Sequence, residues 1–350
     1  MRATVRLPVR VAVDLRGGDR SAGIVAAGAL LAASERPDLE VILVGPGDGL
    51  PCAGRLGDRV TVVPAPDGVE MDEDPVPAVR ARRGASVRVA AQLVRDGRAD
   101  AMVTVGSTGA ATAAALLTLG RLPGTTRPGL AAVVPAMAHP VVLLDAGASP
   151  DVTPDVLAQY AVAGAAYARS RLRLAEPRVG LLSIGAEAGK GDGLRREAHA
   201  AVAAALAGLA VRFVGNVEGC DVPLGGPADV VVTDGFSGNV LLKGLEGTYQ
   251  LVTSLVGDAL AARGVPAVDR SAVGDPLHRE RWGGAVLLGV RGIVVVGHGA
   301  STERAVAACI EQAAGAVRDG VLGGVEAGLA ELAARRRVAV GLPVTRSPGR

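Results

Sequence analysis

Residues 101–120 read AMVTVGSTGAATAAALLTLG and carry no charge over about the 20 residues that a helix needs to cross a bilayer. Their interior, Gly106-Ser107-Thr108-Gly109, consists of turn formers and divides the stretch in two. A short run with valine precedes this turn and an alanine-rich run follows it, which is typical of a strand that leads into a helix. We therefore interpret the stretch as strand, turn and helix, and we predict a soluble protein.

On both sides of this stretch, the chain contains short runs that are rich in β-branched residues and have few polar residues inside them. Such runs are typical of strands buried on both faces, as in a parallel sheet. Alanine-rich helical stretches separate them, so the pattern predicts an α/β fold with crossover helices. The expected strands are residues 11–14, 41–44, 60–63, 102–105, 130–134, 141–144, 179–184, 230–233 and 293–296. The expected helices include residues 22–33, 87–95, 156–169, 197–206 and 305–317.

No linker or internal repeat divides the sequence into separate units. We therefore expect residues 1–340 to form a single catalytic α/β domain of two lobes. Its longest helical region begins at Asn239, and the helical segment with the polar stretch behind it occupies about residues 239–282. Residues 341–350, with the Arg335-Arg336-Arg337 run before them, are expected to form a flexible tail.

The charge balance narrows the classes of partner. The chain has 350 residues, of which 37 are basic and 35 acidic, and its formal net charge is +2. This balance gives no strong field, so we expect no nucleic-acid partner and membrane association that is at most peripheral. Aromatic residues make up only 2% of the chain, which also argues against nucleic-acid binding through base stacking.

The cysteines and the missing motifs indicate which cellular compartment and which cofactors to expect. The three cysteines, Cys52, Cys220 and Cys309, are odd in number and far apart, which fits neither a disulfide framework nor a zinc site. The N-terminus lacks the apolar run of a signal peptide, so we expect a cytoplasmic protein. No HExxH occurs, no GxGxxG follows the first strand, and Gly189-Lys190-Gly191 lacks the spacing of a nucleotide-binding loop. We expect no metal and no cofactor.

Glycine-rich turns with polar residues follow six of the predicted strands. Glycine lets a backbone approach a ligand, and a helix N-terminus offers unpaired N–H groups to an anion. Because ligands bind at the carboxyl ends of strands in open α/β sheets, these turns predict an oxyanion site, with Asp14, Asp145 and Asp234 facing the same rim. The alternative for each loop is that small residues only permit a tight turn and that the aspartate caps it. The six turns are residues 14–19, 106–110, 145–149, 185–191, 234–239 and 297–301.

Two lysines stand out because arginine has replaced lysine almost everywhere else. Only Lys190 and Lys243 occur among the 37 basic residues, and they are candidates for sites that need a compact ammonium group. The alternative is that these two positions have kept lysine by chance. His298 is flanked by glycines at a strand end, which favours a functional role for it over the other histidines.

Several motifs occur in a recognisable order. They are Asp14 through Gly17-Gly18-Asp19, Thr108-Gly109-Ala110, Leu143-Leu144-Asp145 with Gly147-Ala148, Asp234-Gly235-Phe236-Ser237-Gly238-Asn239-Val240 with Lys243, and Gly283-Gly284-Ala285 with Leu287-Leu288-Gly289 and the later His298-Gly299. With them the sequence, from about Val11 to Val317, resembles the bacterial phosphate acyltransferases of phospholipid synthesis, the acyl-ACP:phosphate transacylase or PlsX family.

The resemblance implies a Rossmann-like three-layer α/β/α sandwich of the isocitrate and isopropylmalate dehydrogenase type, and a homodimer. It also implies conversion of acyl-ACP and inorganic phosphate into acyl phosphate and free acyl carrier protein. Two alternatives stay open: a diverged acyltransferase that uses another carrier or acyl-CoA, and a non-catalytic protein that binds an acyl carrier.

The sequence also departs from the usual pattern of the family. Arg16 stands where the family usually has methionine, and Ala186 replaces a glutamate. Ser107, Ser149 and Ser183 stand where it usually has asparagine, and a hydroxyl offers fewer hydrogen bonds than an amide. We expect these three serines to line one cavity and to weaken contacts with the ligand.

Under this interpretation the turns at residues 106–109 and 235–238 cradle the anion, and Lys190, Lys243 and His298 supply charge or handle protons. The acyl chain would lie in a groove of Ala, Val and Leu, and the surface arginines Arg80, Arg82 and Arg83 would dock the carrier. The residues expected to bind substrate or phosphate are Asp14, Gly17, Gly18, Ser107, Thr108, Gly109, Asp145, Ser149, Asp234, Ser237, Gly238 and Asn239.

Overall fold

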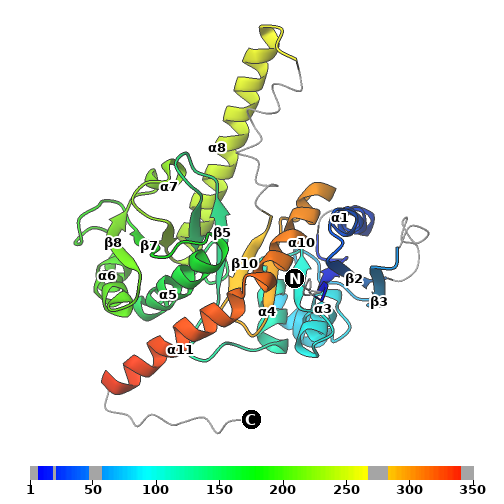
Figure 1. The fold of residues 1–350 in the computed structure, drawn as a ribbon, viewed down its shortest axis with the longest axis horizontal. Coiled ribbons are helices and arrows are strands. Elements are labelled where there is room, and N and C mark those ends of the chain that lie inside the picture. The colour runs from blue at the N-terminus through cyan, green and yellow to red at the C-terminus, as the bar shows by residue number, and fades with distance from the viewer. Residues whose placement is uncertain (1–6, 19–20, 47–56, 267–282, 340–350) are drawn as a thin grey trace, which may run out of the picture.

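One eleven-stranded sheet runs through the part of the chain that the structure describes (Figure 1). The structure is a computed structural model, which describes residues 7–18, 21–46, 57–266 and 283–339. The strand order is β3-β2-β1-β4-β11-β10-β5-β6-β9-β7-β8. The strands are β1 (Val9–Asp14), β2 (Leu39–Gly45), β3 (Val60–Pro64), β4 (Ala101–Thr104), β5 (Gly129–Val134), β6 (Val141–Leu144), β7 (Arg178–Leu182), β8 (Arg212–Val217), β9 (Val230–Val232), β10 (Ala285–Leu288) and β11 (Ile293–Val296).

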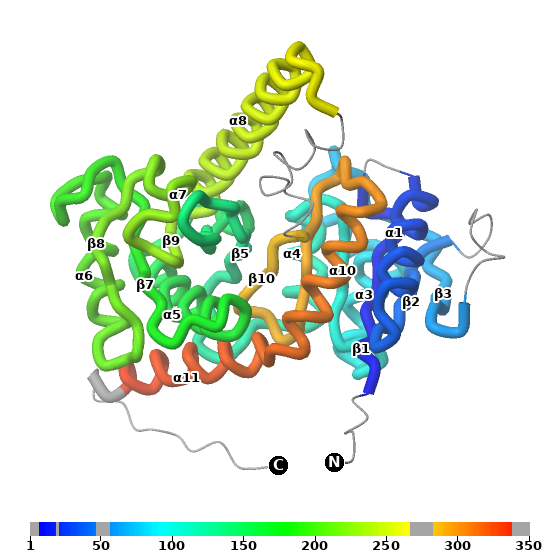
Figure 2. Tube along the Cα trace, turned by 45° about the horizontal axis from the view of Figure 1, so that its top comes forward, coloured from blue at the N-terminus to red at the C-terminus, as the bar shows by residue number. Residues whose placement is uncertain are grey.

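Helices cover both faces of this sheet (Figure 2). Val11 and Val13 of β1 belong to the core beneath α1 and α10, whereas Ala12 between them faces α3 and α4. This alternation is the period of a strand buried on both sides. The helices are α1 (Ala22–Glu35), α2 (Pro75–Ala81), α3 (Ser86–Arg95), α4 (Thr108–Thr118), α5 (Pro154–Arg171), α6 (Gly193–Leu206), α7 (Asp221–Leu224), α8 (Gly235–Ala262), α10 (Glu303–Arg318) and α11 (Val321–Ala339).

The sheet reverses direction at its middle. Strands β1, β2, β3, β4 and β11 are parallel, and β10 is antiparallel to both β11 and β5. β5 is in turn antiparallel to β6, and β6, β9, β7 and β8 are parallel. The carboxyl ends of β1, β4 and β11 therefore lie at one edge of the sheet, and those of β6, β9 and β7 lie at the opposite edge.

The α/β class is confirmed, and each of the nine expected strands is found, but the expectation of a parallel sheet is wrong at its centre. β10 and β8 were not expected from the sequence. β10 follows two glycines, which are typical of a turn. β8 is an edge strand with a register shift opposite Val179 and a glycine, Gly215, at a φ of 83°.

The end of the described chain also differs from the expectation. The Arg335-Arg336-Arg337 run belongs to α11 and is not part of a frayed tail. Arg335 pairs with Glu331, and Arg336 Nη2 lies 3.1 Å from Asp155 Oδ1 at the start of α5. Buried Val325 and Leu329 anchor the helix in the main core. The expected tail at 341–350, and the part of the expected helical segment from 267 to 282, lie outside the described residues.

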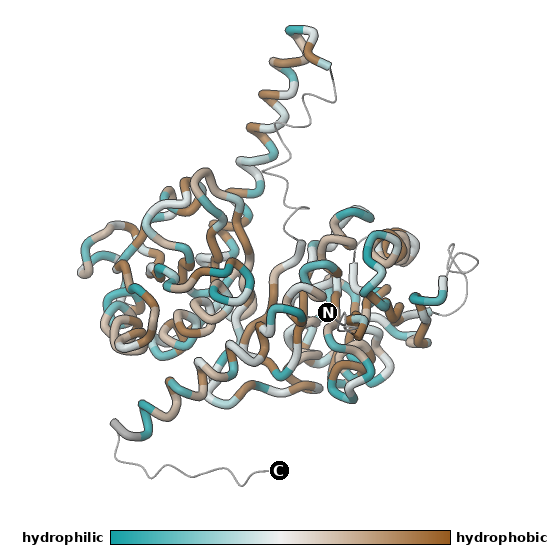
Figure 3. Tube along the Cα trace, viewed as in Figure 1, coloured by the Kyte–Doolittle hydropathy of each residue, from teal (hydrophilic) through white to brown (hydrophobic). Residues whose placement is uncertain are grey.

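Residues 101–120 form β4, a turn and α4, as the glycines predict. Among the helices that the structure describes, none is long and apolar enough to cross a membrane. The longest, α8, extends away from the rest of the molecule (Figure 1), and hydrophobic and hydrophilic residues alternate along it (Figure 3).

Candidate active site

A cavity of about 710 Å³ lies over β5 and β10, with α8 along one side. Its apolar walls come from β5 and α8 and include Leu130, Val133, Leu242 and Leu245. Polar side chains reach it from the start of α4, from α8 and from the loop after β11. These are Thr108, Asn239, Lys243, Glu246, Tyr249, Gln250, Thr253, Ser254, His298 and Ser301.

Four of the residues predicted from the sequence meet in this cavity: Thr108, Asn239, Lys243 and His298. Asn239 donates its Nδ2–H to the Ala146 carbonyl oxygen at 3.1 Å, which fixes the side chain. Lys243 is exposed and pairs with Glu246 one turn along α8, at 2.9 Å. The cavity therefore combines a cation, an amide and an imidazole with an apolar wall.

The loop after β11 orients His298. The backbone N–H of Ala300 donates to His298 Nδ1 at 3.1 Å, and the His298 carbonyl accepts from the Ser301 N–H and hydroxyl. Because Nδ1 accepts, the neutral ring carries its proton on Nε2. His298 is thus set up as a hydrogen-bond donor through Nε2.

The N-terminus of α4 is the second polar feature of the cavity. Its N-cap residue, Ser107, makes no side-chain cap hydrogen bond. Among the described residues, nothing accepts a hydrogen bond from the backbone N–H groups of Thr108, Gly109 and Ala110. These groups and the helix dipole favour an anion at the place where Thr108 reaches the cavity.

Asp14 lies outside the residues that line this cavity and holds two turns together. Its buried carboxylate accepts from the hydroxyls of Ser86 at 2.5 Å and Thr104 at 2.8 Å, and from the Arg16 N–H at 3.1 Å. Burial raises the pKa of Asp14 above its ordinary value, although these donors act against the rise. A Cβ on Gly17 would press on Thr104 and Asp14, and one on Gly18 would meet Val105, so both glycines allow the close approach of these turns.

Asp145 plays the same structural part after β6. Its carboxylate accepts from four backbone N–H groups, those of Leu130, Gly147, Ala148 and Ser149, at 2.7–2.9 Å. Burial raises the pKa of Asp145 against the effect of these donors. The Ser149 hydroxyl donates to the Pro128 carbonyl at 3.0 Å, so it serves the same turn.

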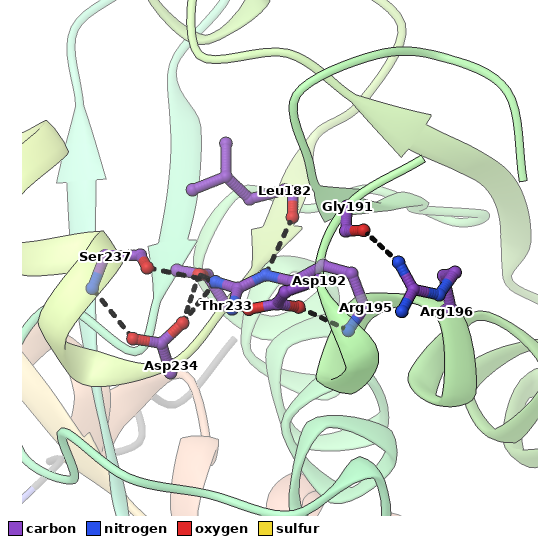
Figure 4. Close-up of polar contacts among 8 residues, drawn as sticks. All are labelled: Leu182, Gly191, Asp192, Arg195, Arg196, Thr233, Asp234 and Ser237. Atoms are coloured by element: carbon purple, nitrogen blue, oxygen red, sulfur yellow. Dashed lines mark hydrogen bonds and ion pairs between the residues drawn. The ribbon is translucent and has the colours of Figure 1, made fainter. Parts of the chain in front are cut away.

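Asp234 caps α8 and pairs with a buried arginine that sequence reasoning missed. Its carboxylate accepts from the Ser237 N–H at 2.8 Å and forms an ion pair with Arg195 (Figure 4). Burial alone would raise the pKa of Asp234, but the Ser237 N–H and the Arg195 charge outweigh it and lower the pKa. The available signal for Arg195 was Asp192, which caps α6 three residues earlier.

Three of the four N–H groups in the expected anion cradle at residues 235–238 already donate to the protein itself. The Gly235 N–H donates to the Ser149 carbonyl, the Ser237 N–H to Asp234, and the Gly238 N–H to the Asp234 carbonyl. These three N–H groups are therefore not available to bind a ligand. In the turn at 106–109, the Gly106 N–H donates to Thr104 Oγ1. The N–H groups of Thr108 and Gly109 have no acceptor among the described residues, and Thr108 lines the cavity.

The expectation that Asp14, Asp145 and Asp234 face one rim is wrong for Asp14. Asp14 ends a strand at one edge of the sheet, whereas Asp145 and Asp234 follow strands that end at the opposite edge. The expectation that the three serines line the ligand cavity is also wrong here, because none of Ser107, Ser149 and Ser183 lines it. The Ser183 hydroxyl is buried without a hydrogen-bond partner in the described part of the chain and lies beside Gly191.

The remaining predicted residues fall outside the cavity. Lys190 is exposed in the turn between β7 and α6, and it does not line the cavity with Lys243 and His298. Arg82 is committed to Glu73, at 2.5 Å, while Arg80 and Arg83 are exposed at the end of α2. One cavity residue, Cys309, was not expected there, because nothing near it in the sequence sets it apart from the rest of α10.

The fold resembles that of solved α/β structures. A EutD phosphotransacetylase from Staphylococcus aureus matches with a TM-score of 0.57 at 17% identity, over 89% of this chain and 94% of that one. A 4-hydroxythreonine-4-phosphate dehydrogenase from Klebsiella pneumoniae matches with a TM-score of 0.52 at 17% identity, over 87% of this chain and 98% of that one. At these identities the matches show the fold alone.

The sequence comparisons are more specific. A family model described as "Fatty acid synthesis protein" matches residues 9–323. A phosphate acyltransferase from Desulfitobacterium hafniense (strain Y51) is 41% identical over 325 residues, which are 90% of this chain and 95% of the relative. The chain belongs to this family of phosphate acyltransferases, as the sequence motifs predict.

Proposed function

We propose that the protein transfers an acyl group from acyl carrier protein to inorganic phosphate and so produces acyl phosphate for phospholipid synthesis. Membership of the phosphate acyltransferase family supports acyl transfer to phosphate. The observation that carries the proposal is the cavity, in which Thr108, Lys243 and His298 adjoin a wall of Leu and Val side chains. Such a site suits a phosphate and an acyl chain side by side.

The reaction needs no covalent intermediate on the protein. A phosphate oxygen attacks the thioester carbonyl carbon, the carbon–sulfur bond breaks, and the carrier's thiolate leaves and takes up a proton. Positioning and stabilisation of charge are then the main tasks of the protein. The first N–H groups of α4 and the Lys243 ammonium would hold the phosphate, and His298 would donate from Nε2 to the oxygen that gains negative charge.

Several finer features belong to the same proposal. The strand reversal and the helices on both faces support a fold of the isocitrate and isopropylmalate dehydrogenase type. We expect a single two-lobed catalytic domain, a homodimer and a cytoplasmic protein that is at most peripheral at the membrane. Acyl carrier protein and phosphate are the expected partners.

The direct test traps acyl phosphate with hydroxylamine. Purified protein is incubated with acyl-ACP or acyl-CoA, each with and without phosphate, and blanks without protein correct for direct attack of hydroxylamine on the thioester. We expect phosphate-dependent hydroxamate, formed faster from acyl-ACP. Release of thiol at the same rate without phosphate would indicate a hydrolase, and no product from either donor would overturn the proposed activity.

The two lysines test the assignment of the cavity. Lys243→Met removes a charge-assisted contact of about 1.5–3 kcal/mol, so the KM for phosphate should rise roughly tenfold or more. Lys190→Arg keeps the charge but changes the shape of the head group. A parental KM in the Lys243 variant would remove Lys243 from the phosphate site, and a parental turnover in the Lys190 variant would remove Lys190 from the candidates.

A further inference from the structure

Arg195 of α6 is buried, and its guanidinium group contacts several polar groups. Only 9% of its surface is exposed. Its Nη2 donates to Thr233 Oγ1 at 2.9 Å and to Ser237 Oγ at 3.0 Å, and it pairs with Asp234 (Figure 4). Its Nη1 lies 3.0 Å from Asp192 Oδ2, and its Nε donates to the Leu182 carbonyl at 3.4 Å.

These partners belong to different elements of the fold. Leu182 ends β7, Thr233 follows β9, Asp192 caps α6, and Asp234 and Ser237 form the cap of α8. One planar guanidinium therefore ties the start of α8 to the start of α6 and to two strand ends. A lysine ammonium is a single point charge and could not reach partners that lie in so many directions.

The start of α8 matters because the helix carries two residues of the cavity. Asn239 and Lys243 follow Asp234 along α8, and both line the cavity. The nine helical steps from Asp234 to Lys243 span roughly 13 Å, so a tilt of about 5° at the cap would move Lys243 by about 1 Å. A displacement of about 1 Å in a reacting site can reduce the rate on the order of a hundredfold.

We propose that Arg195 is a positioning residue for acyl transfer, which fixes the N-terminus of α8 and so holds Asn239 and Lys243 in place at the phosphate end of the cavity. Arg195 itself is not among the residues that line the cavity. The inference rests on the proposed function, because it assigns Arg195 to the reaction that this cavity would catalyse.

The test compares Arg195→Met and Arg195→Lys with Arg196→Met. Arg196 is the next residue on α6 and is exposed, and its Nη1 donates to the Gly191 carbonyl at the surface, at 2.6 Å. For Arg195→Met we expect a KM for phosphate raised at least tenfold, with a smaller change in the KM for the acyl carrier. Arg195→Lys should recover part of the loss, and Arg196→Met should match the parent.

A measurement that does not depend on activity completes the test. In folded Arg195→Met, amide hydrogen exchange should rise over residues 235–245 and stay at the parental rate in β1 and β4. A folded variant with parental phosphate KM, or one with faster exchange throughout the molecule, would overturn the positioning role. If the parent forms no acyl phosphate, the proposed function fails, whereas the exchange result still decides whether Arg195 fixes α8.

Discussion

Asp14 and Asp145 are both buried carboxylates, but they accept hydrogen bonds from donors of different kinds. Two donors to Asp14 are hydroxyls, which can rotate and become acceptors. All four donors to Asp145 are backbone N–H groups, which can only donate. An asparagine at position 14 could donate its NH₂ to one of the hydroxyls. An asparagine at position 145 would place its NH₂ against a backbone N–H, which cannot accept a hydrogen bond.

We therefore expect Asp145→Asn to lower the free energy of unfolding by about 1–3 kcal/mol, because one buried N–H loses its acceptor. Asp14→Asn should cost clearly less, since Ser86 and Thr104 can adapt. Urea unfolding followed by circular dichroism measures both variants. Equal losses in the two variants, or a larger loss in Asp14→Asn, would show that the type of donor does not decide the effect.

Cys309 is the cysteine that lines the cavity among the described residues. Burial raises the pKa of its thiol to about 12, so almost none of it is thiolate at neutral pH. We predict that no acyl-enzyme forms during turnover. Mass spectrometry of the chain, quenched in acid while acyl-ACP is consumed, should show an unmodified peptide around Cys309, and an acyl adduct there would contradict the prediction.

At the scale of the element, two glycines of α8 show which part of the helix is fixed. A Cβ at Gly238 would overlap the carbonyl oxygen of Asp145, whereas nothing lies within 4 Å of a Cβ at Gly244. Gly238→Ala should therefore destabilise the protein by about 1–3 kcal/mol through overpacking. Gly244→Ala should stabilise it by roughly 0.5–1 kcal/mol, because alanine favours the helix.

Thermal unfolding of the two alanine variants provides the measurement. A similar effect on the melting temperature in both would mean that the contact between Gly238 and Asp145 does not hold the helix. The contrast is sharp because the two positions share one helix and differ only in what surrounds them.

The elements that the sequence predicted correctly are those with a strong local pattern. The valine runs of β1, β4 and β11 are buried on both faces, so their composition alone marks them. β10 is as short as β4 and β11, but it follows two glycines, and its partner Leu130 in β5 lies far from it in the sequence. The antiparallel β5–β6 pair could have been predicted, because residues 135–140 are too few for a crossover helix.

The candidate site was predictable residue by residue but not as an arrangement of the whole molecule. Glycine and aspartate marked the turns correctly, because each turn has its own local requirement for them. Which turns meet depends on the direction of every strand between them. β10 reverses that direction by pairing with β11, which is near it in the sequence, and with β5, which is distant. Thr108, His298, Asn239 and Lys243 could therefore be proposed as one site. The sequence alone could not show that Asp14 and Asp145 follow strands that end at opposite edges of the sheet.

At the scale of the whole molecule, α10 and α11 connect the two parts of the sheet. α10 packs beside α1 and β1, and α11 continues from it along α5, below the β6–β8 part. Leu329 of α11 is 2% exposed and belongs to the main core. Leu329→Ala should lower the free energy of unfolding by about 2–5 kcal/mol.

Glu326→Ala serves as the control, since Glu326 is exposed on the same helix and should change stability by at most about 0.5 kcal/mol. Urea unfolding compares the two variants. If Leu329→Ala is no less stable than Glu326→Ala, α11 is not part of the core that joins the two parts.

The position of β11 has a consequence for the order in which the chain folds during synthesis. Strands β6, β7, β8 and β9 come from one continuous stretch, residues 141–232, and can pair as soon as that stretch has left the ribosome. β4, in contrast, has its partner in β11, where Ala101 pairs with Ile293. One edge of β4 therefore waits for most of translation, and an unpaired buried strand of this kind is the segment that a chaperone would need to shield from aggregation.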